Sequence, residues 1–215
     1  QQTLATQTGA IGVYGNVSLG GMADLDLALI GGLSAHTSKR QVIANNQVQT
    51  ATGLFTSYFF APSAALSVPV LSGDAGTLLF KTSATYVGGL TSAYTETGSA
   101  MNLAVGSQTI SVFDVRAGLE GRHDIGTAGG MSGTLTAKAG VFAQINAGSA
   151  SVPVTTLGQT INIATPGSSA YGVYGGVGFE SQLSEALKLT MSADGSIRTD
   201  GLTSLSIKGG LAGTF

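Results

Sequence analysis

Apolar residues alternate with polar or very small residues along most of the chain. At least nine segments between residues 11 and 211 repeat this two-residue period, which is the period of a β-strand with two different faces. In one of them, Ile11 and Val13 fall on the side opposite Tyr14 and Asn16. All the segments fit a single phase. We therefore predict an all-β protein with one apolar face and one polar face.

The predicted connections between these strands alternate in length. Short turns fall near residues 20–22, 73–76, 127–133 and 184–186, and long stretches fall near 37–56, 95–111 and 147–168. Outer-membrane barrels have short periplasmic turns and long outer loops. A periplasmic C-terminus puts every short turn on the periplasmic side and leaves residue 1 near the outer rim after an odd number of strands. Either residues 1–8 form a weak tenth strand or strands are missing.

Composition indicates that lipid, not water, surrounds the apolar face. Charged residues make up 9% of the 215 residues and the mean hydropathy is +0.32, whereas soluble domains carry about 25% charged residues. No apolar run approaches the roughly 18 residues of a membrane helix. Backbone groups in lipid must then pair between strands. We predict one domain over residues 1–215, an antiparallel transmembrane β-barrel with about nine or ten strands, against the alternative of a soluble β-protein.

The polar face consists mostly of Gly, Ser, Thr and Ala with isolated charges of both signs, which suits a barrel lumen better than bulk water. These charges either neutralise one another or line a wet channel that guides a translocating segment. On the apolar face, Tyr58, Tyr86, Tyr171 and Phe179 are candidates for aromatic girdles. The expected lumen charge network is Asp24, Asp26, Lys81, Asp114, Arg116, Glu120, Arg122, Lys138, Glu180, Lys188, Asp194 and Arg198.

Three stretches of the chain resemble the autotransporter β-domain family. The segment Tyr94-Thr95-Glu96-Thr97-Gly98, followed by Asn102-Leu103 and a strand at 115–122, is similar to a Tyr-Thr-Glu-x-Gly segment that precedes an outer loop in that family. The strand at 62–70 and the closing segment 172–215 look like the family as well. The resemblance covers about residues 50–215.

The resemblance implies an outer-membrane translocator that anchors and exports an N-terminal passenger to the surface of a Gram-negative bacterium by type V secretion. Its implied partners are outer-membrane lipid, its own passenger segment and the barrel-assembly machinery. Family barrels usually have twelve strands preceded by a helix that threads the pore, so this chain is a fragment or a shortened relative. The alternative is a stand-alone structural or pore-forming barrel. The implied C-terminal assembly signal is Leu205, Ile207, Leu211 and Phe215.

Catalytic and cofactor chemistry finds little support in the sequence. The two histidines, His36 and His123, fall near opposite rims and on opposite faces, so an enzyme would have to pair His36 with Asp24 or Asp26. The glycines of 175–178 lack the Lys-Ser/Thr of a phosphate loop. No calcium loop or His/Cys metal spacing is present, and a net charge of −2 offers no basic patch for nucleic acid. We expect no enzyme activity, no cofactor and no metal.

Overall fold

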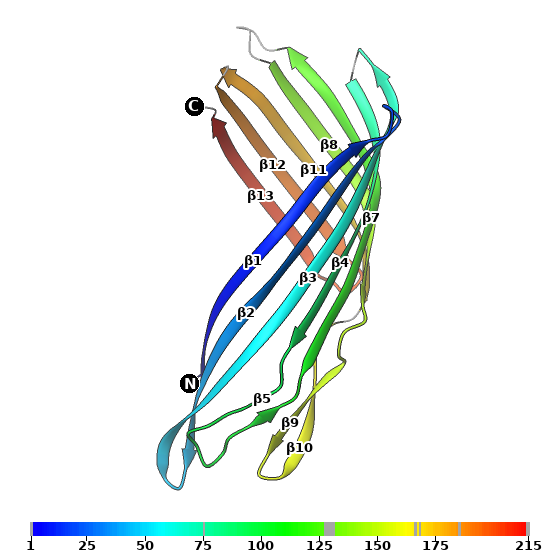
Figure 1. Cartoon of the computed structure of the whole chain (residues 1–215). Coiled ribbons are helices and arrows are strands. Elements are labelled where there is room, and N and C mark those ends of the chain that lie inside the picture. The colour runs from blue at the N-terminus through cyan, green and yellow to red at the C-terminus, as the bar shows by residue number, and fades with distance from the viewer. Residues whose placement is uncertain are drawn as a thin grey trace.

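The chain forms one large sheet of nine strands and one small sheet of four (Figure 1). The computed structural model describes residues 2–74, 76–126, 132–165, 167, 169–184 and 186–213, and these contain no helix. The large sheet consists of β1 (Gln2–Ser18), β2 (Asp24–Ala44), β3 (Gln47–Gly73), β4 (Gly76–Thr91), β7 (Gln108–Gly126), β8 (Ser132–Asn146), β11 (Ala170–Ser184), β12 (Leu187–Arg198) and β13 (Thr203–Gly213), in that order. The small sheet has the order β10 (Gln159–Ala164), β9 (Ser151–Thr156), β6 (Ala104–Val105) and β5 (Tyr94–Thr95).

Every neighbouring pair in the large sheet is antiparallel, and the registers keep the two predicted faces separate across it. One row of partners, for example, runs from Glu120 through Lys138 and Gly176 to Asp194. The predicted all-β, antiparallel fold is therefore confirmed. The suggested tenth strand at residues 1–8 is wrong, because residues 2–18 form a single strand that pairs with β2 along its whole length.

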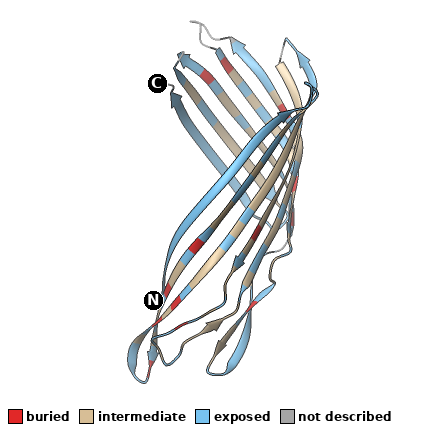
Figure 2. Cartoon of the chain, viewed as in Figure 1, coloured by how far each residue is buried: buried red, intermediate tan, exposed pale blue. Residues whose placement is uncertain are grey.

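The sheet curls (Figure 2), and the exposure of its side chains indicates that the polar face is concave and the apolar face convex. Adjacent residues of one strand show the difference: Leu119 is 48% exposed and Glu120 only 8%, and Val141 is 57% exposed and Phe142 only 8%. Side chains on a concave surface converge, whereas those on a convex surface spread apart. We call the concave polar side the inner face and the convex apolar side the outer face.

The β2–β3 connection corrects one prediction. The stretch near 37–56 is no long loop, because β2 continues to Ala44 and β3 starts at Gln47. Asn45 and Asn46 make the turn with φ angles of 52° and 58°, the left-handed geometry that Asn tolerates and two-residue hairpins require. β3 has 27 residues, although about 10 suffice to cross a bilayer, so this hairpin extends well beyond any membrane-spanning part.

The sheet has two different rims. The short-turn rim carries the β1–β2, β3–β4, β7–β8 and β11–β12 turns and the end of β13, and the long-loop rim carries the opposite connections (Figure 1). At the short-turn rim Gly20 and Gly21 take positive φ as the predicted turn requires. Of the other predicted short turns, Ala75, residues 127–131 and Glu185 lie outside the described residues. The stretches 95–111 and 147–168 carry β5, β6, β9 and β10.

The edge strands β1 and β13 pair with β2 and β12 respectively and not with each other in the described part of the chain. With nine antiparallel strands they run in the same direction (Figure 1). Edge N–H and C=O groups need hydrogen-bond partners inside a bilayer, so the two edges are the part of the sheet that its own described pairing leaves incomplete. The described residues contain no helix long and apolar enough to cross a membrane.

Candidate functional site

The inner face of the C-terminal strands is lined with ion pairs. Glu120 lies between two cations, with Lys81 Nζ 2.9 Å and Arg122 Nη2 2.7 Å from its carboxylate. The register brings them together, because Lys81 on β4 lies opposite Gly118 and Arg122 follows Glu120 by two residues on the same face of β7. The Glu120 side chain is 10% exposed. Two cations therefore compensate one nearly buried acid.

A second ion pair crosses three strands. Lys138 Nζ on β8 lies 2.7 Å from Asp194 Oδ1 on β12, and Gly176 on β11 is the residue between them. A Cβ at Gly176 would collide with the Asp194 carboxylate and lie 3.0 Å from Lys138 Cε. Gly176 therefore has a definite structural role, since the ion pair passes over it.

Arg116 is held between an acid and two aromatic rings. Its Nε lies 2.7 Å from Asp114 Oδ1, and its guanidinium carbon lies 5.6 Å from the centre of the Phe142 ring and 5.9 Å from that of Tyr174. These distances are within the range of cation–π attraction. The planar group is therefore fixed on the inner face.

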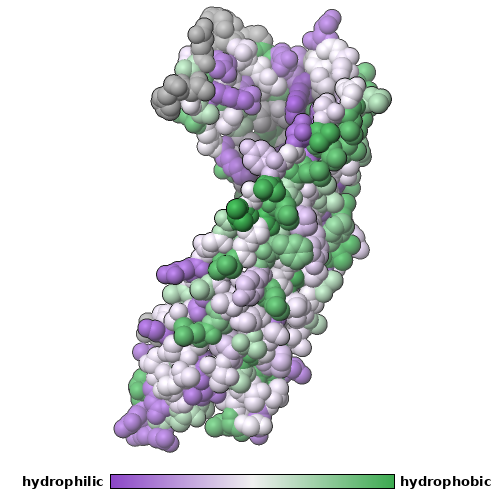
Figure 3. Space-filling model, in the orientation of Figure 1, coloured by the Kyte–Doolittle hydropathy of each residue, from purple (hydrophilic) through white to green (hydrophobic). Residues whose placement is uncertain are grey.

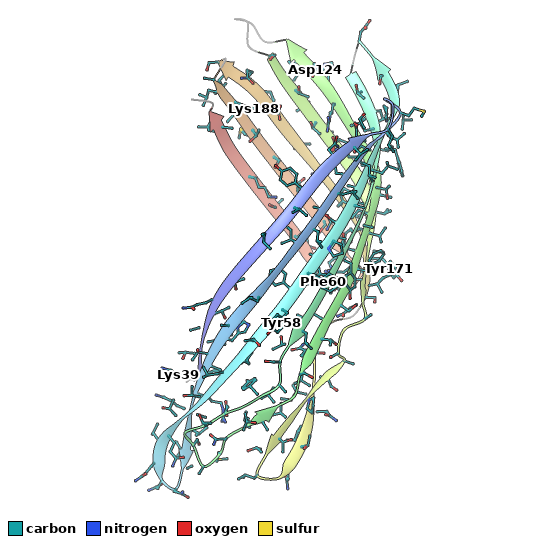
Figure 4. The ribbon with its side chains drawn as sticks, in the orientation of Figure 1. Lys39, Tyr58, Phe60, Asp124, Tyr171 and Lys188 are labelled. Atoms are coloured by element: carbon teal, nitrogen blue, oxygen red, sulfur yellow. The ribbon has the colours of Figure 1, made fainter. Side chains whose placement is uncertain are left out.

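The remaining cations of the expected network lie closer to the rims. Lys188 Nζ is 2.6 Å from Glu180 Oε1 near the short-turn rim, where Figure 4 shows Lys188. At the long-loop rim, Arg198 pairs with Asp200 at 2.7 Å and donates to Gln144 Oε1 at 2.6 Å. The hydrogen bond that Arg198 donates to Asp200 is the main cause of the lowered pKa of Asp200. Sequence reasoning missed Asp200, because it lies in a turn and outside the alternating pattern.

The N-terminal strands line the inner face differently. Asp26 accepts a hydrogen bond from Asn16 at 2.7 Å, and the side chain of Asp24 has no hydrogen bond or ion pair with the described residues. His36 bonds to Thr6 Oγ1 and Ser57 Oγ, each at 3.0 Å. The suggested pairing of His36 with either aspartate is wrong, since His36 lies opposite Phe55 whereas Asp26 lies opposite Ala65, far along the same strands.

The Tyr94-to-Gly98 motif fastens the β4–β7 connection to the β2–β3 hairpin. Glu96, 3% exposed, accepts from Arg40 Nη2 at 2.6 Å and from the Leu103 N–H at 3.0 Å. The bond to Glu96 raises the pKa of the Arg40 guanidinium. Tyr94 stacks on Phe55 with 4.5 Å between ring centres, and burial raises the pKa of its hydroxyl. The charge partnership of Arg40 and Glu96 was not predicted from the sequence.

Gly98 completes this motif. It has a φ of +92°, and a Cβ there would lie 2.7 Å from the Thr50 carbonyl oxygen. A side chain would thus be strained both by conformation and by contact with β3. The glycine allows the segment to lie flat against the hairpin, where Thr52 and Thr97 exchange backbone hydrogen bonds of 2.8 and 2.9 Å.

The outer face carries the other predicted residues. Leu205, Ile207 and Leu211 lie exposed on β13, and Phe215 of the same predicted signal is outside the described residues. Figure 3 shows hydrophobic residues gathered over the central part of the visible surface and hydrophilic ones at the far ends. Tyr58, Phe60 and Tyr171 are about half exposed and are drawn in Figure 4, while Tyr86, Phe179 and His123 share their face by register. The described residues contain no group of three potential metal ligands.

A family model and a solved structure match the chain. The solved β-domain of the Bordetella autotransporter BrkA aligns over all of this chain and 92% of its own length, at 13% identity and a TM-score of 0.38. No curated protein matches. The family model of the autotransporter beta-domain matches residues 1–194. The chain therefore belongs to the autotransporter β-domain family, the outer-membrane translocators that export a passenger by type V secretion.

Proposed function

We propose that the inner face lines the route of the passenger, that the outer face contacts lipid, and that the short-turn rim and the C-terminus are periplasmic. The observation that carries this proposal is the separation of charge between the two faces. The inner face holds the ion pairs around Glu120, Asp194 and Asp114, whereas the outer face of the same strands exposes residues such as Leu119, Val141 and Val177.

Pairing of the inner charges suits a route better than a binding site. The wall of a conduit must bind a passing segment strongly enough to admit it but weakly enough to release it. The charged side chains of the inner face neutralise one another in salt bridges. The wall can therefore form hydrogen bonds and hold water without a strong net electrostatic field. The twelve predicted charges thus act collectively in this proposal, and none of them is catalytic.

The position of the edge strand supports a partner in assembly. β13 presents Leu205, Ile207 and Leu211 at more than two-thirds exposure and has one unpaired edge in the described chain. An unpaired strand with alternating apolar residues is a template for β-augmentation. We propose that the barrel-assembly machinery recognises β13 before the barrel closes and inserts into the membrane.

The test of export uses the full precursor in a Gram-negative outer membrane, with an epitope in the passenger. We expect externally added protease to remove the epitope from intact cells. Orientation is tested by protease sites inserted at Asn45-Asn46 and at Gly20-Gly21, of which only the first should be cleaved from outside. An epitope that stays protected while the barrel is correctly inserted would contradict export and favour a stand-alone barrel.

A further inference from the structure

The inner face contains a hollow of about 360 Å³ that the ion pairs do not fill. It lies over β11, β12 and β13 and is bounded on one side by Arg116 and Tyr174. We call it the cationic hollow. Its charged lining consists of Arg116, Lys138, Lys208 and Asp194, and its hydroxyl lining includes Ser196, Ser204 and Ser206.

Three of the four charged groups of the cationic hollow are already partnered. Asp194 is neutralised by Lys138 at 2.7 Å, and Arg116 by Asp114 at 2.7 Å, the latter from outside the hollow. The side chain of Lys208, an exposed residue on β13, makes no ion pair or hydrogen bond with any described residue, and the strand partner of Lys208 is Ser192. The hollow thus keeps one uncompensated positive charge, unlike the ion-paired wall around Glu120.

The surroundings of Lys208 suit a small anion that can accept hydrogen bonds from the neighbouring serine hydroxyls. Ser196 and Ser204 bond to each other at 2.7 Å, while Ser206, directly opposite Asp194 in the register, has no side-chain hydrogen bond in the described structure. Hydroxyl and ammonium donors together are the groups that bind a carboxylate, and bonds to a charged acceptor are the stronger kind.

We propose that the cationic hollow binds a carboxylate side chain of the peptide segment that occupies the lumen, with Lys208 as its main donor. This proposal rests on the proposed function, because export is what brings a peptide into the lumen. It adds a chemical preference, since an acidic residue in the segment would be held at this point of the wall while neutral residues pass.

The test measures binding of fluorescein-labelled hexaglutamate to the full chain, purified from outer membranes in detergent, by fluorescence anisotropy. We expect the wild type to bind hexaglutamate but not hexaglutamine, and more weakly as salt is raised. Lys208→Gln should raise the Kd about tenfold, the effect of losing one charge-assisted bond. Lys208→Arg should keep most of the affinity.

The matched control is Lys39→Gln, which removes the same charge from an exposed position outside the inner face (Figure 4). It should leave the Kd within about twofold, because Lys39 lies on the opposite face of the sheet from the cationic hollow and charges act weakly at a distance. Absence of hexaglutamate binding by the wild type, or an equal loss in both Gln variants, overturns the proposal. Display of the passenger epitope is measured separately, so failure of export and failure of this site are distinguishable.

Discussion

The two halves of the inner face satisfy the same requirement by different chemistry. From β7 to β12 the polar wall is built from ion pairs, with Glu120 and Asp194 each within 3 Å of a cation. From β1 to β3 it relies mainly on hydroxyl and imidazole groups, as in the chain from Thr6 through His36 and Ser57 to Thr91 on β4. Charge pairs weaken as salt is raised, and loss of one partner leaves the other charge uncompensated, whereas hydrogen bonds between hydroxyls carry no net charge for salt to screen.

The difference also sets where the wall tolerates change. Removing one member of an ion pair leaves a charge in a confined space, but removing one hydroxyl leaves a neutral group that water can satisfy. The C-terminal half is therefore the more sensitive half to single substitutions.

Glu120→Gln should have the largest effect. It leaves Lys81 and Arg122 together without their common acid, and breaking such a buried pair costs about 3 kcal/mol. The measurement is the free energy of unfolding from lipid vesicles in denaturant. Glu180→Gln is the control, since the Glu180 side chain is 50% exposed and should lose no more than about 1 kcal/mol. Equal losses in the two variants would contradict the contrast between confined and exposed pairs.

Gly176→Ala should have the next largest effect. It should lower the free energy of unfolding by about 2 kcal/mol, the usual effect of overpacking. The added methyl group would collide with the Asp194 carboxylate and lie 2.9 Å from the Ala193 carbonyl oxygen. Gly178→Ala is the matched control on the same strand, because its nearest neighbour would be 3.5 Å away. The free energy of unfolding of the two variants is measured in the same way. A greater loss of stability for Gly178→Ala than for Gly176→Ala would disprove the role of Gly176 beneath the ion pair.

Glu96→Gln extends the comparison to the ion pair between Arg40 and Glu96 on the N-terminal side. We expect a loss of about 1.5 kcal/mol, confined to the opening of the β4–β7 connection, because Arg40 and the Leu103 N–H lose their charged acceptor. Hydrogen exchange of the Leu103 amide should accelerate about tenfold, while amides of β8 stay unchanged. Acceleration spread evenly over both would show that the motif stabilises the whole sheet.

The smallest effect concerns pH. Because the pKa of Tyr94 is raised in the folded chain, the folded state holds this proton more tightly than the unfolded state. Its contribution to stability is complete below the ordinary tyrosine pKa of about 10 and is lost as pH rises through the folded value. The absorbance difference between wild type and Tyr94→Phe should show a phenolate step above pH 10. A step at or below that value would contradict the burial of Tyr94.

Alternation along the chain predicted the strands and their two faces because that period is a local property of the backbone. It could not separate a loop from a strand at 37–56, where Gln, Thr and Asn dilute the pattern and two asparagines alone make the turn. The Arg40–Glu96 pair was out of reach too, since 56 positions separate its members. The open edges at β1 and β13 carry no local signal, because alternation is the same in open and closed sheets.

The assignment of the inner face to water and the outer face to lipid is tested most directly by one pair of neighbouring substitutions. Met191, 55% exposed, lies on the outer face of β12, and Thr190 lies on the inner face opposite Glu180. We predict that Met191→Lys lowers the free energy of unfolding from vesicles by about 2 kcal/mol, whereas Thr190→Lys leaves it nearly unchanged. Equal tolerance of both substitutions, or a larger loss for Thr190→Lys, would contradict the account.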